Sequence, residues 1–174
     1  MKRIILIDGP YGIGKTTVAK RVVELSGEAL ECIDPDFYYN GLVEKNPAFI
    51  LMGWPIQHNK TFIVYFRGLV EERLRGKEII IPMSITTELC KTDLLDYFRA
   101  KTELIHIVLE ADKESLLYRI ECDSNRDKEF AINNVENCLH FIEKNLFEAV
   151  RINTSNRSVD EIADEIIKLV KEQN

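Results

Sequence analysis

The sequence predicts an α/β domain with a parallel, doubly wound sheet. Five short apolar runs alternate with segments of helical periodicity along the 174 residues. These runs lack the polar–apolar alternation of half-exposed strands, as expected when helices cover both faces of a sheet. A glycine-rich loop joins the first run to the first helical segment. A chain of this length fits one domain, and residues 1–174 contain no repeat, low-complexity tract or linker.

The predicted elements follow a regular order. Strands are expected at residues 1–8, 29–33, 78–81, 104–109 and 149–152. Helices are expected at residues 16–26, 57–75, 88–101, 112–120 and 130–147, and from residue 158 onward. Asp112 is a typical N-cap residue, and Ser158 with Glu161 forms a capping box. Residues 34–41 are interpreted as the segment that ends the second strand. Residues 42–52 are expected to form a short helix or an irregular lid.

The loop after the first strand carries a phosphate-binding motif. Residues 9–16 read Gly-Pro-Tyr-Gly-Ile-Gly-Lys-Thr, which matches the P-loop pattern G-x-x-x-x-G-K-[ST]. A buried strand precedes the motif and a helix follows it, which is the context the motif requires. The residues expected to bind a nucleotide here are Gly9, Pro10, Tyr11, Gly12, Ile13, Gly14, Lys15, Thr16 and Thr17.

The residue types of this loop explain its chemistry. Glycines permit backbone conformations and close approaches that a Cβ would block, so the loop N–H groups can face phosphate oxygens. Lys15 is expected to reach the β- and γ-phosphates as a catalytic cation, and the Thr16 hydroxyl to ligate Mg²⁺. The alternative is a glycine-rich turn that binds nothing. The flanking elements favour a nucleoside triphosphate, with ATP and Mg²⁺ as cofactors.

Composition excludes several other classes. The net charge of −6 argues against a dedicated nucleic-acid binder, because phosphate backbones attract basic surfaces. The sequence has no apolar stretch long enough to span a bilayer, and its N-terminus enters a strand rather than a signal peptide. Four scattered cysteines, without a C-x-x-C pair, are expected to be reduced packing residues. These features predict a cytoplasmic protein; they leave the oligomeric state open.

Two aspartates after the second strand are candidates for the acceptor chemistry. Asp34 and Asp36 flank Pro35, which favours an extended conformation at Asp34. In an extended segment both carboxylates would face the same side, at the edge where α/β sheets bind substrates. We assign Asp34 as the catalytic base and Asp36 to the metal shell. The alternative is that Asp34 caps a turn and Asp36 is solvated. The usual third-strand carboxylate is absent. Ser84 is one candidate to replace it; the alternative is that the Asp34/Asp36 pair supplies the Mg²⁺ shell.

The polar segment at about 121–129 is interpreted as a lid over ATP. Arg119 and Arg126 bracket it and would bring guanidinium groups to the transferring phosphoryl group. The alternative for Arg126 is that it belongs to a run of charged residues, 123–128, that is exposed to solvent and contacts no phosphate. Asn153 and Thr154 follow the last predicted strand. They are expected either to lie beside the adenine ring of the nucleotide or to form the turn before Ser158.

The region at about 37–60 is the expected acceptor pocket. Besides Asp34 and Asp36, its candidate residues are Tyr38, Trp54, His58 and Arg67. Aromatic side chains suit a ring-binding pocket, although such residues are more often plain core.

With these motifs in view, the chain resembles the ATP-binding tunicamycin-resistance protein family, a branch of the small P-loop kinases. The resemblance rests on the P-loop, on Asp34-Pro35, on residues 81–85, on residues 114–119, on Cys138, and on residues 152–154 and 158–163. It implies a P-loop kinase fold with strand order 2-3-1-4-5. Asp34, Lys15, Thr16 and Arg119 occupy positions that match the family's pattern.

The resemblance also implies an activity. It points to an ATP-dependent phosphotransferase acting on a small hydroxyl-bearing molecule, with nucleoside-type antibiotics among the candidate acceptors. A nucleoside or nucleotide kinase is the alternative within enzymes. A nucleotide-dependent protein that sequesters a ligand without phosphotransfer is the alternative from another class.

Overall fold

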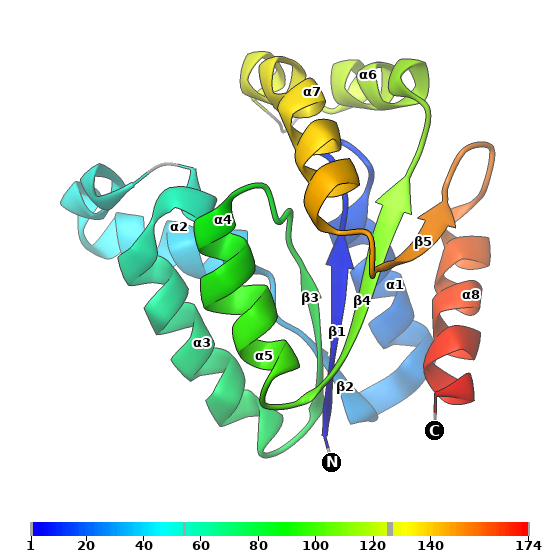
Figure 1. Ribbon diagram of the computed structural model, residues 1–174, viewed down its shortest axis with the longest axis horizontal. Helices are drawn as coiled ribbons and strands as arrows, with labels where there is room; N and C mark the ends of the chain where they lie inside the picture. The colour runs from blue at the N-terminus through cyan, green and yellow to red at the C-terminus, as the bar shows by residue number, and fades with distance from the viewer. Residues whose placement is uncertain (1, 54, 125–126, 174) are drawn as a thin grey trace.

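A five-stranded parallel sheet forms the centre of the protein. The computed structural model describes residues 2–53, 55–124 and 127–173. The strands are β1 (Arg3–Asp8), β2 (Leu30–Cys32), β3 (Glu78–Pro82), β4 (Glu103–Glu110) and β5 (Val150–Asn153). All pairs are parallel, and the order is β2-β3-β1-β4-β5 (Figure 1). This confirms the predicted fold class and the strand order that the resemblance implies.

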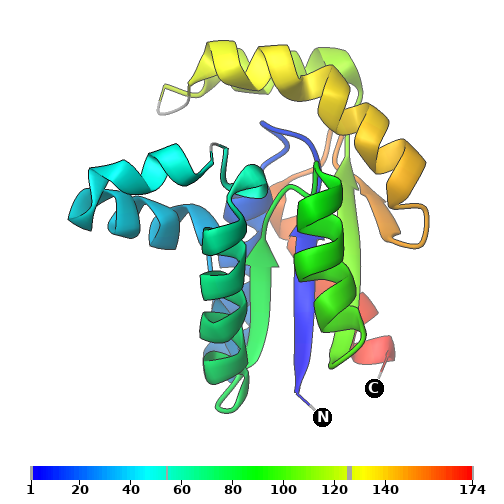
Figure 2. The same cartoon turned by 60° about the vertical axis from the view of Figure 1, so that its left-hand side comes forward.

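Helices cover both faces of this sheet (Figures 1 and 2). The α-helices are α1 (Lys15–Ser26), α2 (Pro35–Lys45), α3 (Lys60–Leu74), α4 (Glu88–Cys90), α5 (Tyr97–Arg99), α6 (Lys113–Cys122), α7 (Lys128–Asn145) and α8 (Val159–Glu172). Short 3₁₀ turns are η1 (Gly27–Ala29), η2 (Pro47–Met52) and η3 (Ile56–His58). A π-helical segment, η4 (Lys91–Asp96), connects α4 to α5.

The central strand shows how the two cores arise. Ile4 and Leu6 of β1 pack into the core under α3 and the α4–α5 segment, whereas Ile5 and Ile7 pack under α1 and α8. All four side chains are almost fully buried. Successive residues of a strand point to opposite faces, so a continuous apolar run supplies both cores at once.

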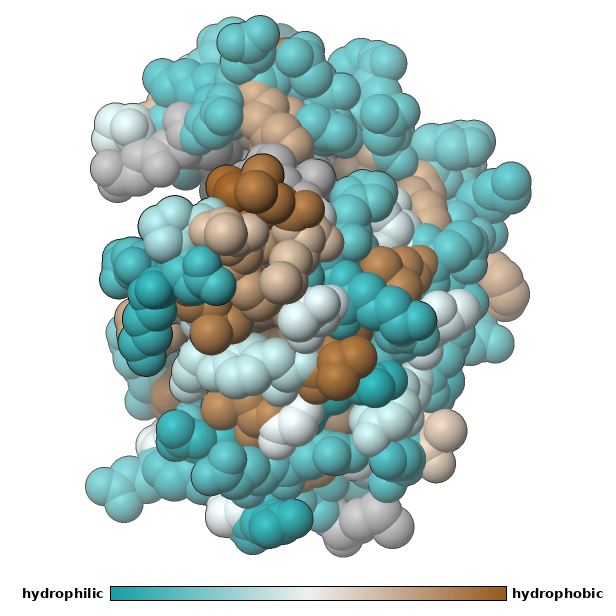
Figure 3. Space-filling view, turned by 90° about the vertical axis from the view of Figure 1, so that its left-hand side faces the viewer, coloured by the Kyte–Doolittle hydropathy of each residue, from teal (hydrophilic) through white to brown (hydrophobic). Residues whose placement is uncertain are grey.

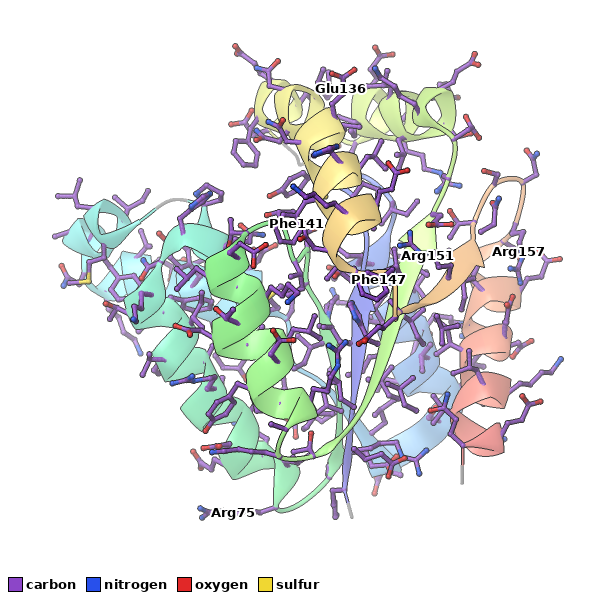
Figure 4. All side chains as sticks on the ribbon, in the orientation of Figure 1. Arg75, Glu136, Phe141, Phe147, Arg151 and Arg157 are labelled. Carbon is purple, nitrogen blue, oxygen red and sulfur yellow. The ribbon has the colours of Figure 1, made fainter. Side chains whose placement is uncertain are left out.

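Helices α6 and α7 lie above the carboxyl ends of the strands (Figure 2). The C-terminal end of α7 is fixed to the sheet by Arg151 of β5, beside the exposed Phe147 (Figure 4). Arg151 Nη2 donates to the carbonyl oxygen of Leu146 at 3.2 Å, and Arg151 Nη1 pairs with Glu110. Helix α7 thus covers the carboxyl ends of the strands, where the P-loop lies.

One predicted region is wrong in detail. Residues 34–41 do not end the second strand as an extended segment; they enter α2, which begins at Pro35. Asp34 is the N-cap and Pro35 occupies the first helical turn, a combination typical of helix starts. The restriction that proline imposes on Asp34 holds, since Asp34 has extended backbone angles, but the chain turns helical directly after it.

Within the described ranges, none of the helices has the length and apolar character needed to cross a membrane. The four cysteines are free thiols. Cys90 and Cys138 are buried in the core, and burial raises the pKa of Cys138 to about 12. Both buried thiols therefore stay protonated, which is the state of packing residues rather than of nucleophiles.

Candidate phosphotransfer site

The P-loop requires glycine for two different reasons. Gly9, Gly12 and Gly14 have φ values of 141°, 83° and 97°, a region that side chains disfavour. A Cβ at Gly9 would also lie 2.7 Å from the carbonyl oxygen of Leu109, and one at Gly12 would lie 2.5 Å from the Ile120 side chain. The loop therefore packs directly against β4 and α6.

Lys15 and Thr16 begin α1 at the mouth of this loop. Lys15 Nζ donates to the carbonyl oxygens of Gly9 and Pro10 at 3.0 and 2.9 Å. No side chain among the described residues caps α1, whose N-cap is Gly14. The positive end of the helix dipole and the lysine ammonium thus meet at one place, which is the arrangement that binds phosphate.

A buried carboxylate supports the loop from below. Asp8 is fully buried, and its Oδ1 accepts from the backbone N–H groups of Gly9 and Ile85 at 2.6 and 3.0 Å. Its Oδ2 lies 3.0 Å from Nε2 of His106 on β4. Ser84 Oγ donates to the Gly9 carbonyl oxygen at 2.9 Å. The first residue of the P-loop is therefore tied to the chain segment after β3.

The sequence patterns did not reveal the role of Asp8, although the sequence carried a signal for it. Asp8 ends an apolar strand, so its carboxylate was bound to be buried. A buried carboxylate needs several hydrogen bonds to offset its desolvation, and these hold the neighbouring loop in place. The Ser84 hydroxyl donates to the P-loop carbonyl oxygen of Gly9 and so joins the loop to the segment after β3. That Ser84 replaces the third-strand carboxylate stays a prediction.

A cavity of about 400 Å³ opens beside the P-loop, a volume typical of small-molecule sites. From the side of α2 the molecule is hollowed below α6 and α7 (Figure 3). We divide the residues that line the cavity into three walls. The phosphate wall is Tyr11, Gly12, Gly14, Lys15, Thr16 and Thr17; the acceptor wall is Pro35, Asp36, Asn40, Pro55, Ile56, Gln57, Pro82, Met83 and Ser84; the lid wall is Asp123, Asp127, Phe130 and Ala131.

The two candidate aspartates face different partners. Asp34 Oδ1 accepts from the backbone N–H of Asp36 at 3.0 Å, which caps α2, and Asp34 Oδ2 accepts from Thr16 Oγ1 at 3.2 Å. Asp36 is exposed and lies on the cavity wall. The prediction that both carboxylates project to one side of an extended segment is wrong, because α2 begins between them.

Thr16 and Asp34 fit a magnesium ion. A threonine hydroxyl and a carboxylate are hard oxygen ligands, and they lie side by side at the phosphate wall. The described residues contain no group of three or more His, Cys, Asp and Glu side chains that could hold a metal. Mg²⁺ does not need such a cage, since one or two protein oxygens with phosphates and water suffice.

Arg119 lies behind the P-loop rather than on the cavity wall. Its guanidinium donates to Oγ1 and to the carbonyl oxygen of Thr154, each at 3.0 Å, and reaches the Ile13 carbonyl oxygen at 3.5 Å. Thr154 is fully buried, and Asn153 Oδ1 accepts from the N–H of Ser155 at 2.7 Å. Asn153 is the last residue of β5, Thr154 follows it directly, and neither is among the residues that line the cavity. Arg126 lies outside the described residues.

Three predicted acceptor residues are not on the cavity wall. Arg67 donates to the Asp93 carbonyl oxygen at 3.2 Å and stacks on the Tyr97 ring at 4.2 Å, so it joins α3 to the π-helical segment. His58 is exposed, and Tyr38 packs edge-on against Phe37 of the same helix. Trp54 lies outside the described residues.

Other cavity residues were missed by sequence analysis. Phe130 of α7 packs edge-on against Tyr11 with ring centroids 5.4 Å apart, so the lid wall rests on the P-loop. Burial raises the pKa of Tyr11 to about 12, which keeps its phenol neutral. Gln57 and Asn40 carry no motif in the sequence, since only the folded chain brings η3 and α2 to the same wall.

Comparisons with known proteins agree with this geometry at the level of fold. No protein-family model matches the chain, and no curated protein matches it in sequence. The structure of the Deinococcus radiodurans tunicamycin resistance protein matches with a TM-score of 0.76 and 21% identity, over 98% of this chain and 96% of that one. Shikimate kinase from Acinetobacter baumannii, in complex with shikimate, matches with a TM-score of 0.66 and 22% identity, over 100% of this chain and 95% of that one. The APS kinase of Mycobacterium tuberculosis, in complex with AMPPNP and APS, matches with a TM-score of 0.65 and 17% identity, over 98% of each chain. The chain has the fold of the P-loop small-molecule kinases.

Proposed function

We propose that the protein is an ATP-dependent kinase that phosphorylates a hydroxyl group of a small molecule. One observation carries the proposal. A P-loop with its lysine and threonine forms one wall of a cavity, and a carboxylate, Asp36, lies on the facing wall. Phosphoryl transfer needs little more than a charged cradle for the phosphates and a group that orients the attacking hydroxyl.

The phosphate wall acts on the donor. The loop N–H groups and the N-terminus of α1 hold the phosphate oxygens, and Lys15 places its ammonium against the charge of the β- and γ-phosphates. On nucleotide binding, the Lys15 ammonium exchanges the carbonyl oxygens of Gly9 and Pro10 for phosphate oxygens. Thr16, with Asp34 beside it, would hold Mg²⁺, which neutralises charge on the phosphates when bound.

The geometry favours Asp36, rather than Asp34, as the base. Asp34 already accepts hydrogen bonds from the α2 cap and from the Thr16 hydroxyl, and beside Thr16 it would hold Mg²⁺. Asp36 lies on the acceptor wall, where it can accept a hydrogen bond from the attacking hydroxyl and take its proton. We therefore exchange the roles predicted from the sequence.

Arginines contribute in two ways in this proposal. Arg119 holds the P-loop through the Ile13 carbonyl oxygen and so acts as a positioning residue. Arg126, in the segment between α6 and α7, is proposed as the cation that reaches the phosphoryl group when the lid closes. An ATP-consuming enzyme whose cysteines form no disulfide is suited to the cytoplasm.

A product screen tests the proposal. The protein is incubated with ATP, Mg²⁺ and a panel of nucleosides, nucleotides, nucleoside antibiotics including tunicamycin, sugars and shikimate. Mass spectrometry is expected to detect one acceptor that has gained a phosphoryl group, and not in the Lys15→Ala control. Nucleotide binding without any phosphorylated product would contradict kinase activity and favour a protein that sequesters its ligand.

A further inference from the structure

His106 is a polar side chain in the middle of an apolar strand. It lies on β4 between Ile105 and Ile107, which are both buried, and only 6% of the residue itself is exposed. Its register partner on β1 is Leu6, whose side chain belongs to the core under α3 and the α4–α5 segment. An aliphatic residue would fill such a position without burying any polar atom. A histidine at this place in the sheet is therefore costly unless its ring nitrogens find partners.

The two ring nitrogens of His106 differ in their surroundings. Nε2 lies 3.0 Å from Oδ2 of Asp8. An ionised carboxylate only accepts hydrogen bonds, so Nε2 is the donor in this contact. Nδ1 is buried and has no hydrogen-bond partner within the part of the chain that the structure describes. Because an unpaired buried atom costs stability, the benefit of His106 comes from what it does to Asp8.

The contacts of Asp8 show what that benefit is. Its Oδ1 accepts from the N–H groups of Gly9 and Ile85, while its Oδ2 faces His106. The terminal torsion of an aspartate is broad, so the rotamer of Asp8 does not by itself fix the plane of the carboxylate. Contacts on both oxygens do fix it. Gly9 is the first residue of the P-loop and has φ 141°, so the position of its N–H sets the direction in which the loop leaves β1.

Taking the nucleotide binding of the proposed function as the premise, we propose that His106 is a positioning residue for the phosphate site. It orients the Asp8 carboxylate, which holds Gly9, so the N–H groups of the loop are in place before the nucleotide arrives. A preorganised site binds more tightly, because less free energy is spent on ordering it. His106 is not among the residues that line the cavity, so it acts through Asp8 and not on the nucleotide itself.

Two amide substitutions at His106 test this role. The side-chain nitrogen of glutamine can occupy the place of Nε2, whereas that of asparagine, one methylene group closer to the backbone, lies nearer the place of Nδ1. Calorimetry with Mg²⁺ and a non-hydrolysable ATP analogue measures the Kd of both variants. We expect His106→Asn to raise this Kd about tenfold or more, and His106→Gln to keep it within about threefold of the wild type. Equal losses of affinity in the two variants, or no loss in His106→Asn, would overturn the proposal.

The backbone N–H of Gly9 reports on the positioning without any nucleotide. An amide proton in a short hydrogen bond to a carboxylate resonates far downfield, because such charge-assisted bonds are strong. In proton–nitrogen correlation spectra, the Gly9 resonance is expected downfield in the wild type and in His106→Gln, and shifted upfield in His106→Asn. An unchanged Gly9 resonance in His106→Asn would contradict the proposal. A wild type that binds no nucleotide would contradict the proposed function, whereas this spectrum would still decide whether His106 holds the loop.

Val70→Ala separates this role from a general loss of stability. Val70 is fully buried near the C-terminal end of α3, which leads to the start of β3, so it lies at the opposite end of the sheet from the P-loop. The substitution is expected to lower the Tm and to leave the Kd for the ATP analogue unchanged. If Val70→Ala weakens nucleotide binding as much as His106→Asn does at a matched loss of Tm, the positioning role is wrong.

A measurement on the wild type covers the case in which His106→Asn fails to fold. Nitrogen NMR of the imidazole ring distinguishes a protonated ring nitrogen from an unprotonated one, and the hydrogen bond to Asp8 places a proton on Nε2. We expect the Nε2 resonance of a protonated nitrogen. A ring protonated at Nδ1 alone could not donate to Asp8, and this result would overturn the proposal.

Discussion

The phosphate wall and the acceptor wall of the cavity are built in different ways. The phosphate wall is one stretch of chain, from the loop after β1 into the first turn of α1. Asp8, the last residue of β1, and Ser84, in the segment after β3, hold its first residue, Gly9. Most of the acceptor wall comes from α2 and η3, which lie between β2 and α3 and contribute no strand. The difference teaches that donor binding is encoded in a local pattern, whereas acceptor binding depends on how separate segments fold together. The following variants test that separation.

The largest effect is expected at Asp36. If Asp36 takes the proton of the acceptor hydroxyl, Asp36→Asn should lower the single-turnover rate by about 10²–10⁴-fold with ATP affinity retained. Asp34→Asn is the comparison, and it should weaken Mg²⁺ dependence more than the chemical step. Rapid-quench rates at saturating ATP and acceptor distinguish the two. A chemical step abolished by Asp34→Asn alone would restore the roles predicted from the sequence.

Lys15→Ala probes the phosphate wall alone. Removing its ammonium should lower kcat by about 10²–10³-fold, the usual cost of losing one preorganised electrostatic partner in the transition state. Calorimetry should also show weaker ATP binding. Acceptor affinity, measured by NMR without nucleotide, is expected to stay unchanged. A loss of acceptor affinity equal to the loss of ATP affinity would show that the two walls are not independent.

A pair of glycine substitutions gives the smallest effect and the sharpest comparison. Gly53 has φ 138°, and a Cβ there would lie 2.8 Å from the carbonyl oxygen of His58. Gly53→Ala should cost about 1–3 kcal/mol through strain in the turn before η3 and raise the acceptor KM. Gly12→Ala, which meets Ile120, should instead impair ATP binding. Gly41→Ala, with open space around its Cβ in α2, is the control and should stabilise the fold by about 0.5–1 kcal/mol.

Thermal unfolding together with separate ATP and acceptor titrations checks this set. Gly53→Ala is expected to leave the Kd for ATP within about twofold of the wild type, a change of under 1 kcal/mol. If Gly53→Ala weakens ATP as much as it weakens the acceptor, the acceptor wall supports the P-loop and the separation fails.

How well the sequence predicts each wall of the cavity depends on whether the residues of that wall are close together in the sequence. The P-loop, the five strands and the Ser158–Glu161 capping box were predicted because each depends on residues close together in the sequence. The start of α2 was misjudged, although Asp34-Pro35 is a helix-start pair, because proline after an aspartate is equally typical of turns.

The acceptor wall could not be predicted from local sequence patterns. Gln57 stands among residues without periodicity, and only tertiary contacts bring it beside Asp36 and Met83. Arg67 was expected in the pocket because it lies near the irregular region, but helical periodicity alone does not say which neighbour a polar residue of α3 meets. Its partner, the Asp93 carbonyl oxygen, belongs to a π-helical segment that the sequence did not reveal.

The packing of α7 along its whole length has a mechanical consequence. The helix has 18 residues, so it extends about 27 Å from the end fixed by Arg151 to its first turn above the P-loop. One face of this helix is buried along that whole length, through Ala131, Val135, Cys138 and Ile142. A displacement at either tip therefore acts on the close-packed cores beneath the helix. Phe130 lies at the N-terminal tip, in contact with the Tyr11 ring. A rearrangement around Arg151 would therefore be carried through the packing of the whole helix to the residues beside the P-loop.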